Sequence, residues 1–273
     1  MMWYRIKSFF KFYWQAGTKY NVQSPFLHDF VTNVLDTDKQ YYAFSKIEKV
    51  RHQLLSDHSV IIIEDHGAGS QQNGNNRRRR IAAIASTSVS DSGKCRLLFQ
   101  ICNYYHSNNI IELGTSLGIS SAYLAAADGR SKVVTMEGAQ NIAEKAAEVH
   151  RLLGYKNIEI KVGPFDQNLD EVLSEMGQVD FVFLDGNHNK AATLRYFDKI
   201  LPFCNDHTII VLDDIYWSEG MTAAWKEIEK HVAVTLSIDL FDIGIVFLSK
   251  NLSKQQVSYI PYKYKPWRIG LFG

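Results

Sequence analysis

Short strand-like stretches alternate with amphipathic helical stretches from about residue 109 onward. This alternation, with short connections, predicts parallel βαβ units. After a predicted helix at about 219–231, the segments 232–240 and 242–250 are two strands separated by a tight turn, so they must pair antiparallel. Parallel strands are expected at about 109–114, 132–137, 157–162, 179–185 and 207–213, with helices at about 117–128, 139–153, 165–176 and 189–201. The prediction is a doubly wound α/β sheet of seven strands, five parallel and two in a C-terminal antiparallel hairpin.

The N-terminal part of the chain has a different pattern. Residues 1–60 are predicted to form helices: large aromatic residues recur at helical spacing before residue 15, and a second helix is expected after Ser24-Pro25. Residues 64–76 are rich in glycine, asparagine and glutamine and are predicted to be a linker. The run Arg77 to Arg80 is predicted to open a helix that continues through IAAIA, and a further helix is expected at about 91–106.

Composition limits the class of protein. The chain has 273 residues, of which 46% are hydrophobic and 22% charged, as in an ordinary globular protein. Its net charge is +1, so the overall charge of the chain does not indicate nucleic acid or a membrane as a partner. The three cysteines, Cys95, Cys102 and Cys204, lack metal-ligand spacing and favour a reducing compartment. No apolar run is long enough to cross a bilayer. We therefore expect a cytoplasmic protein with no integral membrane segment.

The segment IIELGTSLG at 110–118, followed by VVTME ending at Glu137, carries the strongest chemical signal. It predicts a strand, a glycine turn, a helix and a second strand that ends on a carboxylate, which is the first half of a nucleotide-type binding fold. Glu137 lies 23 residues after Gly114, close to the ~20 expected for an acid that binds ribose hydroxyls. Ser116 replaces the middle glycine of a dinucleotide fingerprint, and Glu112 adds a negative charge that a pyrophosphate would avoid. A cationic, amino-acid-bearing ligand such as S-adenosyl-L-methionine suits these residues better.

With these motifs in order, the chain resembles the class I S-adenosylmethionine-dependent methyltransferases, and most closely the catechol O-methyltransferase-like small-molecule O-methyltransferases of bacteria. The resemblance covers roughly residues 90–250 and implies a Rossmann-like methyltransferase domain at 86–250. Residues 1–85 would then be a helical cap that covers the substrate, and 251–273 a C-terminal tail. The motifs that carry the resemblance are ELGTSLG, TME at 135–137, VGPFD at 162–166, FLDGNH at 183–188 and VLDD at 211–214.

The resemblance implies a role for each motif. The glycine turn would approach the methionine part of the cofactor, Glu112 would face its ammonium group, Glu137 would bind the ribose, and Phe165 and Asp166 would flank the adenine. The candidate cofactor-binding residues are Glu112, Gly114, Ser116, Gly118, Glu137, Gly163, Phe165, Asp166 and Asp185.

Three carboxylates, Asp185, Asp213 and Asp214, follow neighbouring predicted strands and could hold a divalent metal, with Mg²⁺ the expected ion. The alternative is that Asp213 or Asp214 caps the following turn and no metal binds. His188 is the candidate general base and Lys190 the second choice, although His188 could equally begin the next helix and contact solvent.

The predicted function is transfer of a methyl group to a hydroxyl oxygen of a small-molecule acceptor with metal assistance. Two alternatives stay open: a non-catalytic cofactor-binding protein of the same fold, and an N-methyltransferase acting on nucleic acid or protein. The first-choice function involves no nucleic acid. DGNH stands where amino-group methyltransferases of nucleic acid usually carry an (N/D)-PP-(Y/F) motif, which counts against that alternative.

Three further features each have more than one possible role, and none of them identifies the acceptor. Tyr216 and Trp217 could form a wall against a planar substrate or be ordinary packing. The Arg77–Arg80 run could bind a phosphate-bearing substrate or nucleic acid, since four cations at a helix start oppose the helix dipole and favour a nearby anion; the alternative is a solvated helix start. The aromatic N-terminal helix could lie on a membrane surface, but packing on the domain or on a partner subunit, as a homodimer through the N-terminal helices, is the favoured expectation.

Overall fold

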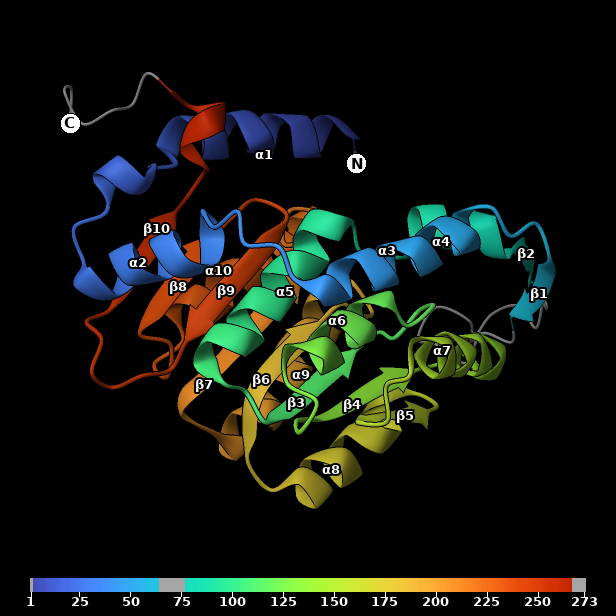
Figure 1. Cartoon of the computed structure of the whole chain (residues 1–273). Coiled ribbons are helices and arrows are strands. Elements are labelled where there is room, and N and C mark those ends of the chain that lie inside the picture. Colours follow the sequence, from blue (N-terminus) through green and yellow to red (C-terminus); the bar gives the residue numbers. More distant parts are fainter. Residues whose placement is uncertain (1, 64–76, 267–273) are drawn as a thin grey trace. The chain divides into compact units, whose positions relative to one another are not determined.

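The computed structural model describes residues 2–63 and 77–266 (Figure 1). The strand order of its main sheet is β10-β8-β9-β7-β6-β3-β4-β5. The chain divides into two compact units, one of residues 39–181 and one of residues 1–38 with 182–273. Strand β6 (Val179–Leu184) crosses the division. The predicted linker at 64–76 lies outside the described residues.

The unit of residues 39–181 contains the first βαβ repeats. Strands β3, β4 and β5 pair in parallel, as the alternating pattern predicts. Its helices pack against these strands and against one another, and their buried side chains form a continuous apolar core. The elements are β3 (Asn109–Leu113), β4 (Lys132–Glu137), β5 (Ile158–Val162), α5 (Ser92–Tyr105), α6 (Ile119–Ala127), α7 (Gln140–Leu153) and α8 (Phe165–Met176).

The unit of residues 1–38 and 182–273 contains the C-terminal hairpin. Strand β9 pairs antiparallel with both β8 and β7, which confirms the predicted hairpin. An eighth strand, β10, pairs in parallel with β8 within the segment predicted to be a tail. The elements are β7 (Cys204–Asp213), β8 (Leu236–Asp239), β9 (Ile243–Phe247), β10 (Gln255–Ser258), α1 (Met2–Gln15), α2 (Pro25–Phe30), α9 (Lys190–Ile200) and α10 (Glu219–Lys230), with a π-helical turn at Val31–Leu35 and 3-10 turns at Lys19–Asn21, Leu201–Phe203 and Tyr262–Tyr264.

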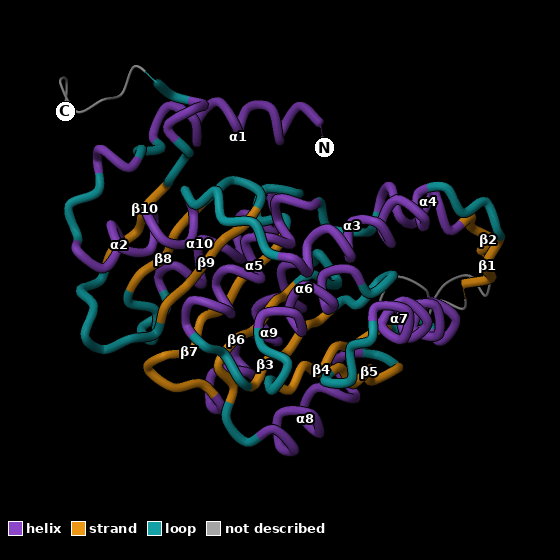
Figure 2. Tube along the Cα trace, viewed as in Figure 1, coloured by secondary structure: helices purple, strands orange, loops and turns teal. Residues whose placement is uncertain are grey.

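One helix prediction was wrong. Arg77–Arg80 forms strand β2, which pairs antiparallel with β1 (Val60–Ile63), and helix α4 (Ile81–Thr87) begins only after it. Figure 2 shows this two-stranded hairpin as a separate strand pair at the end of α4. The β-branched residues of β1 favour an extended strand, and β2 gains backbone pairing along the edge that faces it. Only Arg80, at the N-cap of α4, lies at a helix start, so the four cations are not gathered against a helix dipole.

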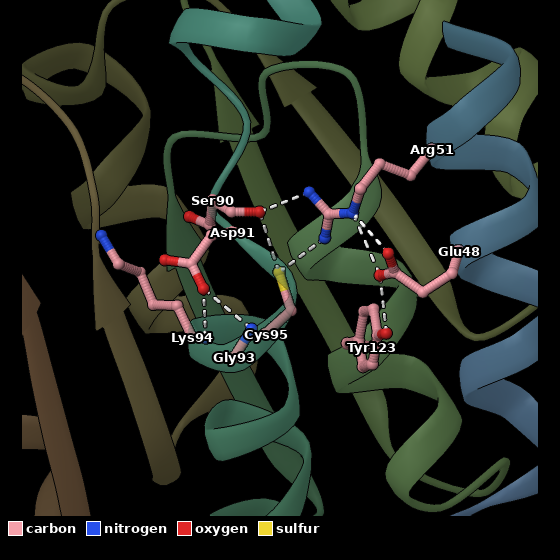
Figure 3. A network of polar contacts seen from close by, with 8 residues as sticks. All are labelled: Glu48, Arg51, Ser90, Asp91, Gly93, Lys94, Cys95 and Tyr123. Atoms are coloured by element: carbon pink, nitrogen blue, oxygen red, sulfur yellow. Dashed lines mark hydrogen bonds and ion pairs between the residues drawn. The ribbon is translucent and has the colours of Figure 1, made fainter. Parts of the chain in front are cut away.

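Helix α3 (Tyr42–Leu55) is held by a polar network that the sequence pattern did not indicate (Figure 3). The guanidinium of Arg51 donates to both carboxylate oxygens of Glu48, to the Ser90 carbonyl and to the Cys95 sulfur. The Tyr123 hydroxyl of α6 donates to Glu48 Oε1 at 2.8 Å. Burial raises the pKa of Cys95 to about 12, so its thiol stays neutral and Glu48 balances the charge of Arg51. The network joins α3 to α5 and α6 inside one unit.

None of the helices in the described part of the chain combines the length and the apolar composition needed to cross a bilayer.

Candidate functional site

The turn after β3 is closed by the end of β4. The backbone N–H groups of Gly114 and Thr115 both donate to the Met136 carbonyl, at 3.0 and 3.1 Å. Gly114 has φ 113°, Ser116 φ 47° and Gly118 φ 79°, so three residues of the turn lie in the left-handed region. A non-glycine residue there is strained, and such strain persists only where the surroundings hold it.

Glu137 supplies part of that hold. Its Oε2 accepts from the backbone N–H of Ser116 at 2.9 Å, and its Oε1 accepts from the N–H of Ala139 at 3.0 Å. The carboxylate thus fixes the strained residue of the turn and the start of α7 together.

Glu112 is completely buried at the end of β3. The Thr135 hydroxyl donates to its Oε2 at 2.6 Å, while its Oε1 is buried without a hydrogen-bond partner among the described residues. Burial raises the pKa of Glu112 to about 7, the nearby Glu137 carboxylate adds to the rise, and the Ser120 and Thr135 hydroxyls oppose it. A buried acid with an unpartnered oxygen is costly unless a donor or a cation reaches it. The Ser116 hydroxyl of the same turn is also buried without a partner.

Gly118 ends the turn and cannot be replaced without a clash. It has φ +79°, and a Cβ on it would lie 2.5 Å from His150 Nε2. His150, on α7, contacts the Gly118 carbonyl at 3.1 Å and the Ser121 hydroxyl at 2.8 Å through that same nitrogen. Burial lowers the pKa of His150 to about 4, so the ring is neutral near pH 7. Sequence reasoning missed this supporting histidine; its only signal was a place on the buried face of an amphipathic helix.

The turn after β5 joins the same group of segments. Gly163, with φ +126°, donates its N–H to the backbone carbonyl of Glu137 at 2.8 Å. The side chain of Asn168 closes the turn by donating to the Val162 carbonyl at 2.9 Å. Phe165 and Asp166 are the first two residues of α8, which follows directly.

The structure therefore brings the turn after β3, the end of β4 and the turn after β5 together within one unit. The candidate cofactor-binding residues of this unit all lie on these segments. The roles given to them individually stay predictions.

The other candidates lie in the second unit. Asp185 follows β6, and its Oδ1 lies 3.8 Å from His188 Nε2, within ion-pair range but too far for a hydrogen bond. Asn189 caps α9 by accepting from the N–H groups of Ala191 and Ala192, so His188 precedes the helix and does not begin it. The ammonium group of Lys190 is engaged by Glu227. Of the two candidate bases, Lys190 is held by a close ion pair, whereas the acid beside His188 in the described residues, Asp185, lies 3.8 Å away.

Asp213 is buried at the end of β7, and Asp214 follows it with φ 52°. The Asp214 carbonyl accepts from the N–H of Trp217 at 2.8 Å, which closes a local turn. No group of three or more histidine, cysteine, aspartate or glutamate side chains among the described residues is arranged to hold a metal ion. The three aspartates are thus not gathered as a metal site, and metal binding stays a prediction.

Tyr216 and Trp217 have different surroundings. The Tyr216 hydroxyl donates to Asp239 Oδ2 at 2.7 Å, and its ring stacks on Phe241 at a centroid distance of 4.9 Å. The Trp217 ring lies 6.3 Å from the His188 ring. Tyr216 is therefore engaged in packing, while Trp217 stays a candidate for contact with substrate.

Comparison with known proteins is consistent with this geometry. A family model described as a methyltransferase domain matches residues 111–215. A search of curated proteins finds no match for this chain. The residues matched by the methyltransferase-domain model include the glycine turn, Glu137, the turn after β5 and the three aspartates.

Solved structures share the fold. The O-methyltransferase TomG from Streptomyces achromogenes, involved in tomaymycin synthesis and solved with S-adenosylmethionine, has 20% identity and a TM-score of 0.55, covering 80% of this chain and 95% of its own. The O-methyltransferase from Bacillus cereus, solved with S-adenosylhomocysteine, has 18% identity and a TM-score of 0.55, covering 81% and 96%. The S-adenosylhomocysteine-bound methyltransferase PaMTH1 of Podospora anserina has 13% identity and a TM-score of 0.58, covering 84% and 98%.

At these identities the structural likeness shows the fold alone, and the domain model marks the segment of this chain that resembles methyltransferases. The predicted Rossmann-like α/β fold is confirmed, with β10 added to the expected seven strands. Residues 111–215 thus match a methyltransferase domain, and the chain has the fold of the O-methyltransferases named above.

Proposed function

We propose that this protein transfers the methyl group of S-adenosylmethionine to a hydroxyl oxygen of a small molecule. The observation that carries the proposal is the pair of acids at the glycine turn. Glu137 is held in place by two backbone N–H groups, and Glu112 keeps one buried oxygen with no hydrogen-bond partner in the described part of the chain. The oxygen specificity is supported by the relatives named above, two of which are O-methyltransferases.

The two acids bind different parts of the cofactor in this proposal. Glu137 accepts from the ribose hydroxyls, because its carboxylate is already oriented and needs no rearrangement. Glu112 faces the ammonium group of the methionine part, directly or through water. An ammonium near Glu112 favours its ionised form, which removes the cost of the unpartnered oxygen.

The bound cofactor supplies an electrophilic methyl group for direct displacement by the acceptor oxygen. The protein then has to orient the acceptor and receive its proton. His188 receives the proton, since Lys190 is paired with Glu227. Trp217, beside His188, contacts the acceptor.

Metal assistance is a separate part of the proposal. Asp185, Asp213 and Asp214 have the oxygen chemistry that Mg²⁺ prefers, but they are not gathered as a site in the described residues. Proton transfer to His188 does not require the metal; Mg²⁺ held by these aspartates would stabilise the developing charge, and this contribution is measured separately.

Calorimetric titration of S-adenosylhomocysteine, with and without Mg²⁺, tests the cofactor site. We expect micromolar binding in both conditions. Turnover with S-adenosylmethionine is then measured on a panel of phenols, catechols and sugars, with the Glu137→Ala variant as the control for signal that does not pass through the site. Absence of binding would refute the cofactor assignment. Binding without turnover, or turnover only on amines, would leave the cofactor site and reject the hydroxyl acceptor.

A further inference from the structure

Helix α1 presents two chemically different faces. Phe12 and Ala16 are buried against Phe241 and Ile260, which belong to the same unit. Arg5 lies on this inner side, where it pairs with Asp242 at 2.5 Å and stands over the Trp217 ring. The helix is therefore docked through one side only.

The opposite side carries large aromatic rings in water. Trp3 is 80% exposed, Phe10 67% and Trp14 82%, whereas Phe12 is 3% exposed. The three exposed rings are spaced by seven and four residues, which puts them on one stripe of a helix. Lys7 and Lys11 are exposed along the same stripe. We call these five residues the aromatic–basic face.

Further aromatic and basic residues adjoin its C-terminal end. The Tyr13 hydroxyl donates to the Tyr264 carbonyl at 2.9 Å, which brings the 3-10 turn at Tyr262–Tyr264 against α1 (Figure 1). The rings of Tyr20 and Tyr262 meet edge to face at 5.2 Å. Tyr20 and Tyr264 are themselves exposed, as are Lys19 and Lys263.

The charge around this face has one sign. The described segments 2–28 and 243–266 contain no aspartate or glutamate, although the whole chain has a net charge of only +1. Asp29 and Asp242 flank these segments in sequence, and Asp242 lies on the inner side of α1, where it is paired with Arg5. A cationic stripe with exposed tryptophans complements a surface that carries negative charges on the outside and has an apolar layer beneath them.

We infer that the aromatic–basic face binds the surface of a bilayer that contains anionic lipid. Tryptophan and phenylalanine enter the boundary between head groups and acyl chains, while lysines reach the phosphates. Helix α1 has 14 residues, about 21 Å in length, and lies along the surface without crossing it. The inference goes beyond methyl transfer and does not depend on it.

A second copy of the chain is the competing occupant. Pairing about a two-fold axis would place α1 against α1, because such an interface uses the same patch on both subunits. Lys7 and Lys11 would then meet cations with no acid from either helix to balance them. This repulsion favours lipid over the homodimer expected from the sequence.

Vesicle flotation of the full chain tests the inference, with Trp emission as a second signal. We expect binding to vesicles of phosphatidylcholine with phosphatidylglycerol, loss of that binding in high salt, and little binding to pure phosphatidylcholine. The Lys7→Gln/Lys11→Gln variant should bind about 30-fold more weakly, from ~1 kcal/mol for each lysine beside an anionic surface. The Trp3→Ser/Phe10→Ser/Trp14→Ser variant should lose more than about 100-fold, since each buried ring contributes ~1.5–3 kcal/mol.

Matched controls use residues outside the face. Lys156→Gln/Lys230→Gln removes two exposed lysines, and Val232→Ser removes a side chain that is 91% exposed; neither should change vesicle binding. Circular dichroism and S-adenosylhomocysteine affinity verify that each variant is folded. The inference is overturned by failure of the wild-type chain to bind anionic vesicles, by equal losses in the controls, or by a dimer in light scattering that the triple variant converts to a monomer.

Discussion

The turn after β3 and the turn after β7 have the same local form and different surroundings. Each follows a strand, precedes a helix and contains a non-glycine residue in the left-handed region, Ser116 with φ 47° and Asp214 with φ 52°. The N–H of Ser116 is bound by a carboxylate from another strand. The carbonyl of Asp214 is bound by Trp217, three residues further along the same turn.

The comparison shows how far each turn is prepared for a ligand. Around Ser116, three chain segments are tied together by backbone and carboxylate bonds, so the geometry exists before any ligand arrives. At Asp214, the backbone bond to Trp217 lies within the turn itself, and the acids of the described residues form no metal-binding group of three. We therefore expect mutations in the first turn to affect folding and cofactor affinity, and mutations in the second to affect turnover.

Gly118→Ala should produce the largest loss in the first turn. Its Cβ would clash with His150 and the residue would be strained at φ +79°, so the free energy of unfolding should fall by about 2–5 kcal/mol, measured by urea denaturation. Gly154→Ala is the matched control, because Gly154 has φ +82° and open space around it. Equal losses in the two variants would show that backbone strain alone accounts for the effect.

Asp213→Ala tests the second turn. We expect affinity for S-adenosylhomocysteine to be unchanged and metal-dependent turnover to fall by at least about 100-fold, since a metal stabilises developing charge by several kcal/mol. Activity of the wild-type protein should fall equally in EDTA and return with Mg²⁺. Full activity in EDTA would reject the metal.

Glu137→Ala should weaken cofactor affinity by about 10- to 100-fold, because hydrogen bonds to a charged group contribute ~1.5–3 kcal/mol. Glu159→Ala is the control, as Glu159 lies on β5 and pairs with Lys132 and Lys161 at the surface. Isothermal titration with S-adenosylhomocysteine measures both. A loss shared by the two variants would point to a general effect of charge.

Two buried groups beside the first turn should oppose each other in their pH dependence. The pKa of His150 is lowered to about 4, so this group makes the protein less stable as pH falls from its unfolded value towards 4. The pKa of Glu112 is raised to about 7, so it makes the protein less stable as pH rises towards 7.

For each group, the free energy of unfolding changes by about 1.4 kcal/mol per pH unit between its unfolded and its folded pKa. The two pH ranges overlap between about pH 4.5 and 6.5, and there the two opposite changes cancel. Relative to wild type, His150→Gln should gain stability as pH falls through this window, and Glu112→Gln should lose it. Urea denaturation at several pH values measures the difference. Parallel curves for all three proteins would contradict the assignment.

The sequence predicted the repeating part of the fold, because each βαβ unit has its own hydrophobic period and its own turn residues. Features that depend on distant partners were missed. Arg77–Arg80 has no strand period of its own and pairs with β1 across a predicted linker. Strand β10 is short and mostly polar, and it forms only because the edge of β8 accepts it.

For the candidate site, the sequence likewise indicated the residues that form a local motif and missed those that act through distant contacts. The glycines and Glu137 form a motif in the printed sequence, and the structure brings their segments together. His150 and Thr135 contribute only through contacts across the fold, so no spacing rule identifies them. Nothing in the sequence distinguished Asp213 and Asp214 as metal ligands from residues of a turn.

The anchoring of α1 has a consequence for protein synthesis. Three carbonyls at the end of this helix, those of Tyr13, Trp14 and Ala16, accept from the ammonium group of Lys265, and the Gly17 carbonyl accepts from the N–H of Ile260. Lys265 is 249 residues from Ala16. At ~5–20 residues per second, a ribosome therefore needs roughly 12 to 50 s after Ala16 to synthesise the segment that contains Ile260 and Lys265. Throughout that interval the aromatic helix is already in solution while its anchor does not yet exist. A nascent chain is therefore open to capture by chaperones, or by a nearby lipid surface, before the finished protein has fixed α1 in place.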